Sequence, residues 1–386
     1  MTHVRGIRPL PLWAWAFSGV LAISLVSCGS NSVDTPTTTH VAALSGDQEV
    51  ATPTTTGGVG TGTLTFDPST LAISGGITVN GITATAAHIH QADAGANGAV
   101  IVALAESSAG SGNWVVPSGS VLTQAQATAL AAGGLYFNAH TAANPAGDIR
   151  GQIGRSVFAV PMSSAQEVPI NATTASGSGL MVLDPVTKKF TARITLTGMT
   201  ATAAHIHNAA IGSNGPVIFP LTETTPGSGT WAAAADATLT DAQLALLNAG
   251  GLYFNAHSTS LPGGQVRGQI GRNIRNASLT GAQENPPTAS TASGTGILVV
   301  DPVTRAASGS ITISGMTATA AHIHLAATGL NGPVIVALTD AGGGVFNVPT
   351  GAVLTADQFR AYKQGELYFN AHSTANPGGE IRGQIR

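Results

Sequence analysis

The stretch ATAAHIHQADAGANG, residues 84–98, contains two histidines one residue apart and ends in an Asn-Gly pair. It recurs as ATAAHIHNAAIGSNG at 201–215 and as ATAAHIHLAATGLNG at 318–332, a spacing of 117 residues each time. A second string, LYFNAH, follows each copy at 135–140, 252–257 and 367–372. The repetition predicts three tandem domains at 40–155, 156–272 and 273–386, each long enough to fold with its own core.

Short apolar segments with a period of two residues predict strands within each unit. GTLTFD (62–67) and AVIVAL (99–104) are examples, and Gly, Pro and Asn turn signals separate such segments. One helix is expected in each unit, because Thr123, Thr240 and Thr355 each begin a Thr-x-x-Gln capping box that a glycine later ends. The predicted fold is mainly β: three tandem antiparallel β-sandwich domains, each with one short helix.

The composition argues against a nucleic-acid binder and against a disordered tail. Charged residues are 9% of the chain, hydrophobic residues are 43%, and the formal net charge of −3 comes without a basic block that could follow a phosphate backbone.

The N-terminal segment has the pattern of a bacterial export signal. Arg5 and Arg8 precede an apolar run that ends in Leu25-Val26-Ser27-Cys28, which resembles a lipoprotein cleavage box with Cys28 as the lipidated residue. We expect a signal peptide at 1–28, a flexible tether at 29–39, and an exported protein of the cell envelope that touches the membrane only through its lipid anchor. The alternative is an ordinary signal peptide with an incidental cysteine. Cys28 is the only cysteine, so the exported domains have no disulfide.

The repeated histidines are the strongest candidate ligands. Residues i and i+2 of a strand project from one face, so His88 and His90 point together, and His140 can join them from a second strand. Three imidazoles suit copper, with zinc as the second choice, and leave a fourth position open. Core histidines bonded to carbonyl groups are the alternative. The predicted metal ligands are nine of the 11 histidines: His88, His90, His140, His205, His207, His257, His322, His324 and His372.

Two other polar positions recur in all three units. The glutamates could accept hydrogen bonds from ligand histidines or pair with an arginine, and the arginines could be those partners or could attract an anionic substrate. Asp148 and Glu380 correspond to Gln265, so a carboxylate there is not required for a shared site. The recurring residues are Glu49, Glu167 and Glu284, and Arg150, Arg267 and Arg382.

The combination of SGDQEV (45–50), TGTLTFD (61–67), the His-Ile-His stretch and LYFNAHTAANPAGDIRGQI (135–153) resembles the CHRD domain, a module named after chordin. The resemblance extends over all three units. It implies an immunoglobulin-like or related β-sandwich and no particular biochemical activity.

A weaker resemblance concerns the site. ITATAAHIH (82–90) and FNAHTAANPAGDIRGQIG (137–154) are similar to the segments of Cu/Zn superoxide dismutases that supply copper histidines and an anion-guiding arginine. This resemblance implies copper bound by His88, His90 and His140, with Arg150 in the catalytic guiding role for superoxide. The corresponding roles fall to Arg267 and Arg382 in the later units. The bridging histidine, the zinc cluster and the disulfide cysteines of that family have no counterparts, so only a copper site is implied.

Three functions follow as hypotheses. The first is an exported copper protein with superoxide dismutase-like activity, and the second is a protein that sequesters copper. The third is a non-enzymatic surface module, in which three copies would increase the avidity for a protein partner.

Overall fold

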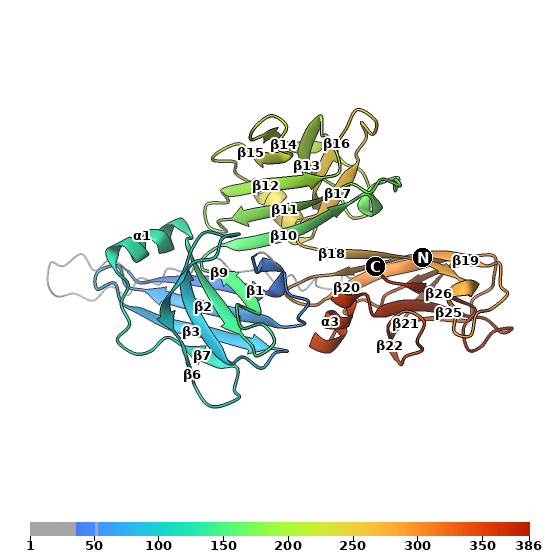
Figure 1. Cartoon of the computed structure of the whole chain (residues 1–386), viewed down its shortest axis with the longest axis horizontal. Coiled ribbons are helices and arrows are strands. Elements are labelled where there is room, and N and C mark those ends of the chain that lie inside the picture. The colour runs from blue at the N-terminus through green and yellow to red at the C-terminus, as the bar shows by residue number, and fades with distance from the viewer. Residues whose placement is uncertain (1–35, 51–52) are drawn as a thin grey trace, which may run out of the picture.

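The computed structural model describes residues 36–50 and 53–386, and it contains three β domains in chain order (Figure 1). The predicted signal peptide, most of the predicted tether and Cys28 lie outside the described residues. Within the described part of the chain, no helix has the length and apolar character needed to cross a membrane.

The domains share one order of elements, with each 3₁₀ helix η following the first strand. The first domain contains β1 (Thr38–Ser45), η1 (Gly46–Gln48), β2 (Val59–Phe66), β3 (Ile73–Asn80), β4 (Ala86–Gln91), β5 (Ala99–Ala103), β6 (Ala105–Glu106), β7 (Asn113–Val115), α1 (Gln124–Ala132), β8 (Leu135–His140) and β9 (Ile149–Gln152). The second contains β10 (Ser156–Ser163), η2 (Ser164–Gln166), β11 (Ser176–Leu183), β12 (Phe190–Thr197), β13 (Ala203–Asn208), β14 (Val217–Glu223), β15 (Thr230–Ala233), α2 (Asp241–Asn248), β16 (Leu252–His257) and β17 (Val266–Gln269). The third contains β18 (Asn273–Thr280), η3 (Gly281–Gln283), β19 (Ser293–Val300), β20 (Ala307–Ser314), β21 (Ala320–Leu325), β22 (Val334–Ala337), β23 (Thr339–Gly342), β24 (Val345–Asn347), α3 (Ala356–Gln364), β25 (Leu367–His372) and β26 (Ile381–Gln384).

Each domain is one antiparallel sheet rolled on itself. In the second domain the sheet closes in the order β10-β11-β12-β15-β14-β13-β16-β17. In the first domain, the segment equivalent to β14 is divided at Leu104 into β5, which pairs with β4, and β6, which pairs with β7. The third domain repeats this division at Leu338. The prediction of mainly β domains with a barrel-like or sandwich-like form is confirmed, and hydrogen bonds join the two layers of each sandwich into one sheet.

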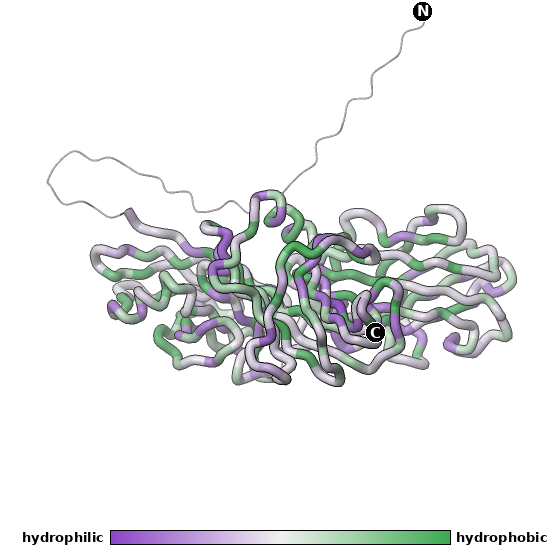
Figure 2. The backbone as a smooth tube through the Cα atoms, turned by 90° about the horizontal axis from the view of Figure 1, so that it is seen from above, coloured by the Kyte–Doolittle hydropathy of each residue, from purple (hydrophilic) through white to green (hydrophobic). Residues whose placement is uncertain are grey.

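Strand alternation separates a core face from a polar face. Ile89 and Phe137 are fully buried inside the first sheet, whereas the histidines of β4 and β8 project from its other face. The buried residues of the three hydrophobic cores lie within 42–153, 160–270 and 277–385, so each core belongs to a single domain. Figure 2 shows hydrophobic stretches of backbone (green) spread over the whole width of the molecule.

The predicted capping boxes are present. In α1, Thr123 accepts from the backbone N–H of Gln126, and the Gln126 side chain accepts from the backbone N–H of Thr123. The same reciprocal bonds begin α2 and α3. Gly133 ends α1 with φ 81° and Gly365 ends α3 with φ 75°, the left-handed conformation that glycine adopts without strain. These caps fix each helix just before the strand that supplies the third histidine.

Specific polar contacts join the domains. Arg155 at the end of the first domain pairs with Asp184 in the second, and Arg272 pairs with Asp301 in the third. Asp47 in η1 also binds Lys363 in α3, so the first and third domains are in direct contact. Figure 1 shows the second domain packed against the two domains that flank it.

Candidate metal centre

Strand pairing places the three histidines of each domain together. In the first domain β4 and β8 are antiparallel neighbours with Ala86 opposite His140 and His88 opposite Asn138. His88 and His90 therefore lie on the face of β4 that looks toward His140, while Ile89 enters the core. The pairings of β13 with β16 and of β21 with β25 are equivalent.

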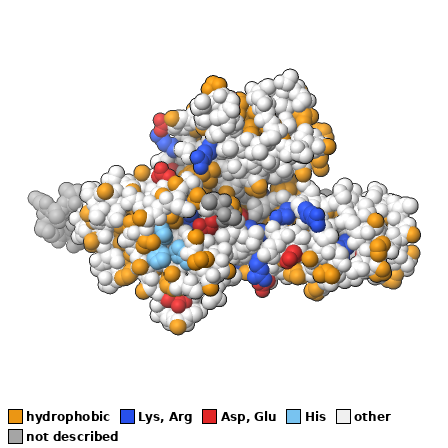
Figure 3. All heavy atoms as spheres, viewed as in Figure 1, with side chains coloured by type: hydrophobic (Ala, Val, Ile, Leu, Met, Phe, Trp, Pro, Cys, Tyr) orange, Lys and Arg blue, Asp and Glu red, His pale blue; other side chains and the backbone are white. Residues whose placement is uncertain are grey.

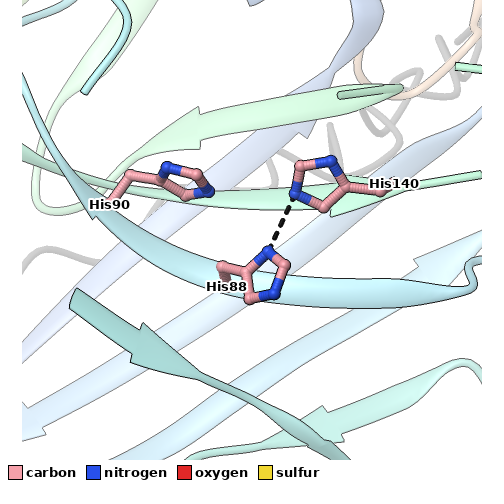
Figure 4. Close-up of side chains that lie close together, drawn as sticks. All are labelled: His88, His90 and His140. Carbon is pink, nitrogen blue, oxygen red and sulfur yellow. Dashed lines mark hydrogen bonds between the residues drawn. The ribbon is translucent and has the colours of Figure 1, made fainter. Parts of the chain in front are cut away.

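The ring nitrogens are close enough to share one ion. His88 Nδ1 lies 3.0 Å from His140 Nε2, and the equivalent distances are 3.1 Å in the second and third domains. In each trio, one ligand nitrogen from every histidine lies within 4.8 Å of the others. Two nitrogens bound at about 2.0 Å to a tetrahedral ion would be separated by about 3.3 Å, so only small ring movements are needed. Figure 4 shows the His90 ring directed toward the hydrogen-bonded pair. Each of these three-histidine groups can hold a metal ion.

Backbone carbonyl groups orient two of the rings. His90 Nδ1 donates to Gly98 O at 2.9 Å, and His140 Nδ1 donates to Pro145 O at 3.1 Å. An Nδ1–H that is held in this way leaves Nε2 as the unprotonated nitrogen that can bind a metal. The Nε2 atoms of His90, His207 and His324 are buried and have no hydrogen-bond partner among the described residues. A buried acceptor without a partner costs free energy, and a metal ion would supply the missing partner.

Burial also favours the form of histidine that binds metals. Desolvation lowers the pKa of His88, His90 and His140, and the mutual repulsion of the rings contributes at His90 and His140. The pKa values of His205, His207 and His257 are lowered in the same way, with burial as the main cause. The lowered pKa values of these six imidazoles favour the neutral form, which is the form of histidine that binds a metal ion.

A β-bulge adjoins each trio. Along the β4–β5 pair, His88 faces Ala103, Ile89 faces Val102 and His90 faces Val100, so Ile101 has no partner. The same register shift occurs between Ile206 and His207 and between Ile323 and His324. Bulges alter the direction of neighbouring side chains and are common beside functional sites. Figure 3 shows histidine side chains reaching the surface of the first domain, on a face with few charged groups.

The structure places the predicted arginines behind the histidines, away from solvent. Arg150 is 1% exposed, and its guanidinium lies 3.5 Å from the centre of the Tyr136 ring. The other face of Tyr136 stacks on His90, with 4.9 Å between the ring centres. Arg267 and Arg382 occupy the same position against Tyr253 and Tyr368. The guiding role that the superoxide dismutase resemblance implies stays a prediction, but the contacts of these arginines support a structural role.

The recurring glutamates contact neither the histidines nor the arginines through a hydrogen bond or a close ion pair among the described residues. Each pairs with an asparagine of the LYFNAH strand, as Glu167 does when Asn255 donates to it and Glu284 does with Asn370. Burial raises the pKa of Glu49 and of Glu167 to about 7, against the opposing effect of the nearby arginine. The glutamate is therefore a buried partner of the strand that supplies the third histidine.

The position shared by Asp148, Gln265 and Glu380 also lies apart from the ligand atoms. Asp148 accepts hydrogen bonds from Thr141 and Asn144, and Glu380 accepts from Ser290 and Ser373. None of these contacts involves a ligand nitrogen, which agrees with the presence of a neutral glutamine, Gln265, at this position in the second domain.

Sequence reasoning missed the tyrosine and the glutamine that complete the histidine surroundings. Tyr136 stacks on His90, and the Gln152 side chain donates to Ala92 O and Gly133 O. Both residues recur in LYFNAH and RGQI of every unit, so the internal repeat contained the signal. Recurrence alone does not identify them, because buried strands also repeat such residues for packing.

Comparison with known protein families supports the repeat pattern. The CHRD domain model matches residues 40–153, 158–270 and 275–385, which together cover most of the chain. Searches of curated proteins and of solved structures found no match. The chain therefore belongs to the CHRD-domain family, with three copies of the domain in tandem.

Proposed function

We propose that this protein binds one copper ion in each domain through its three histidines. The observation that carries the proposal is the buried Nε2 of His90, His207 and His324, which lacks a hydrogen-bond partner and faces two further imidazoles. Histidines that served only packing would be expected to satisfy both ring nitrogens when buried. The same unpartnered nitrogen occurs in all three domains, so it is not a peculiarity of one loop.

The donor set fits copper better than a hard cation. Three neutral imidazoles suit copper and zinc, whereas calcium and magnesium require oxygen ligands. Bound copper would supply one-electron redox chemistry at a position that three ligands leave open. The roles of the chain itself are to hold the three nitrogens close together and to orient the His90 and His140 rings through backbone carbonyls.

Superoxide dismutase-like activity is the further part of the proposal, and it rests on the resemblance of the histidine strands. Superoxide is a small anion that could reach the site beside His88, the least buried histidine of the first trio. Copper sequestration requires the same ligands but no substrate. The rival function is a surface module for a protein partner, in which the histidines would have no metal.

Metal analysis separates these functions. The exported region, residues 29–386, is purified without added metal, titrated with Cu(II) and with Zn(II), and compared with a variant in which His88, His205 and His322 are alanine. About three copper ions per chain, one for each trio, support the proposal, and the triple variant should lose them. No stoichiometric binding in the wild type would favour the interaction module. Superoxide turnover by the copper-loaded wild type above that of the triple variant would indicate an enzyme, and equal rates would indicate sequestration.

We also propose that the protein is exported and held at the bacterial cell envelope by a lipid on Cys28. The support is the sequence pattern of residues 1–28 and the tether that follows it. An anchored protein with three ion sites would keep copper close to the membrane surface.

A further inference from the structure

One loop beside each trio accepts hydrogen bonds at the same backbone carbonyls in all three domains. In the first domain this site loop comprises residues 92–98, between β4 and β5. Arg150 Nη1 donates to Ala96 O at 2.8 Å, Arg150 Nη2 donates to Asp93 O at 3.0 Å, and Gln152 Nε2 donates to Ala92 O at 2.7 Å. Since each acceptor is a backbone carbonyl, these three bonds do not depend on which side chains the loop carries.

The second and third domains repeat these bonds with different loop residues. Arg267 donates to Ser213 O at 2.8 Å and to Ala210 O at 3.2 Å, and Gln269 donates to Ala209 O at 2.9 Å. The equivalent acceptors of Arg382 are Leu330 O and Ala327 O. The loop sequences ADAGANG, AAIGSNG and AATGLNG differ at several positions. The bonds from the buried arginine and glutamine are therefore common to the three loops. In the second and third domains an asparagine side chain adds a further contact, since Asn214 donates to Val168 O and Asn331 donates to Asn285 O.

The last residue of the site loop connects it to the ligand set. Gly98 N–H donates to the Tyr136 hydroxyl at 3.1 Å, and Gly98 O accepts from His90 Nδ1 at 2.9 Å. Tyr136 is itself enclosed between the His90 ring and the Arg150 guanidinium. A displacement of the site loop would therefore remove the acceptor that holds the His90 ring.

We propose that Arg150, Arg267 and Arg382 are positioning residues of the metal centre, which fix the site loop so that its glycine carbonyl turns the Nε2 of the second histidine toward the ion. The metal part of this inference rests on the proposed function. The role differs from anion guiding, because the guanidinium contacts the loop and the tyrosine and is buried beneath them. Its chemistry depends on the forked shape of arginine, which reaches two carbonyls three residues apart.

The test uses the full exported chain with one remaining trio. His88→Ala and His322→Ala disable the outer sites and leave His205, His207 and His257. Three substitutions are then compared in this background: Arg267→Ala, Arg267→Lys and Arg272→Ala. Arg272 is the matched control, because it also donates to backbone carbonyls, at Gly271 and Asn248, but does not contact the site loop.

Two readouts are measured for each variant. The first is the tautomer of His207 in the metal-free protein by proton–nitrogen NMR, which should be the Nδ1–H form in the background chain. The second is Cu(II) affinity together with the electron paramagnetic resonance spectrum of the bound ion. Arg267→Ala should reduce the Nδ1–H population, weaken copper binding about 10 to 100-fold and alter the spectrum. Arg267→Lys should restore neither readout, and Arg272→Ala should change neither.

Tyr253→Phe provides a milder variant in case Arg267→Ala fails to fold. It keeps the ring stack and removes only the hydroxyl that accepts from Gly215 N–H, so it should shift the same two readouts in the same direction by a smaller amount. Unchanged tautomer and copper spectrum in Arg267→Ala, or full restoration by lysine, would overturn the inference. A third outcome separates the two proposals. If the background chain binds no copper, but Arg267→Ala still lowers the population of the His207 Nδ1–H form, the proposed function is refuted and the positioning role is supported.

Discussion

The carboxylate of Asp47 in the first domain lies 2.6 Å from the ammonium group of Lys363 in the third domain. The two side chains are only 16% and 11% exposed, and Asn273 also donates to Asp47 at 2.9 Å. The positions equivalent to Asp47 in the other domains are Ala165 and Ala282, so the repeats differ where this contact forms. The ion pair is therefore specific to the contact between the first and third domains.

A double-mutant cycle with Asp47→Asn and Lys363→Met should detect this contact. Because the pair is largely removed from water, we expect a coupling of about 1–2 kcal/mol in the free energy of unfolding of the first or third domain. The control is the exposed pair Lys189–Asp236, with side chains 57% and 79% exposed, which should show no measurable coupling. Urea unfolding measures both coupling energies. If they are equal, the contact between the first and third domains is not formed as described.

The middle domain should fold without its neighbours. Its hydrophobic core consists only of residues within 160–270, and the sheet closes within the domain. Residues 156–272 expressed alone should therefore give a β-type circular dichroism spectrum and one cooperative thermal transition. The full exported region serves as the control. A product without a cooperative transition would mean that the cores depend on contacts between domains.

The sequence alone predicted the parts of the site that follow from strand alternation. His88 and His90 share a face because they are two residues apart, and LYFNAH supplied the third histidine by its repetition. The hydrogen bond from His90 to Gly98 and the stack of His90, Tyr136 and Arg150 depend on which strands become neighbours. Pairing of strands distant in the sequence has no local signature, so Arg150 could be identified as recurrent but its burial could not be predicted.

The buried glutamate should make the middle domain less stable at higher pH. Burial raises the pKa of Glu167 from 4.5 to about 7, so its contribution to stability is fully present below pH 4.5 and is lost as the pH rises through about 7. Glu167→Gln keeps an acceptor for Asn255 and removes the titration. As the pH rises from 4.5 to 8, the free energy of unfolding of the variant should increase by about 2–3 kcal/mol relative to that of the wild type. Metal-free wild type and variant are unfolded with urea across this range, and a difference that does not change with pH would refute the prediction.

Replacing Cys28 with Ser should release the protein from membranes, because the lipid would have no attachment residue. The measurement is detergent-free fractionation of cells that produce either form, with detection of the protein in membrane and soluble fractions. Ser27→Ala is the control, since a small residue before the cysteine should preserve the processing site. If the Cys28→Ser variant stays as membrane-bound as the wild type, the lipoprotein hypothesis is wrong.

The histidine ligands should differ sharply from the isoleucine between them. In the full exported chain with His88→Ala and His322→Ala, each of His205→Ala, His207→Ala and His257→Ala should weaken copper binding by more than the 10 to 100-fold typical of residues that only orient a ligand. Each substitution deletes a ligand nitrogen from the group within 4.8 Å. Ile206→Val is the control, because Ile206 is fully buried in the core on the opposite face. It should leave copper affinity unchanged and cost about 0.5–1.5 kcal/mol of stability. Copper titrations followed by visible absorption measure the affinities. If the three alanine variants bind copper as tightly as their background, the repeated His-Ile-His motif serves packing, and the copper and enzyme hypotheses are both refuted.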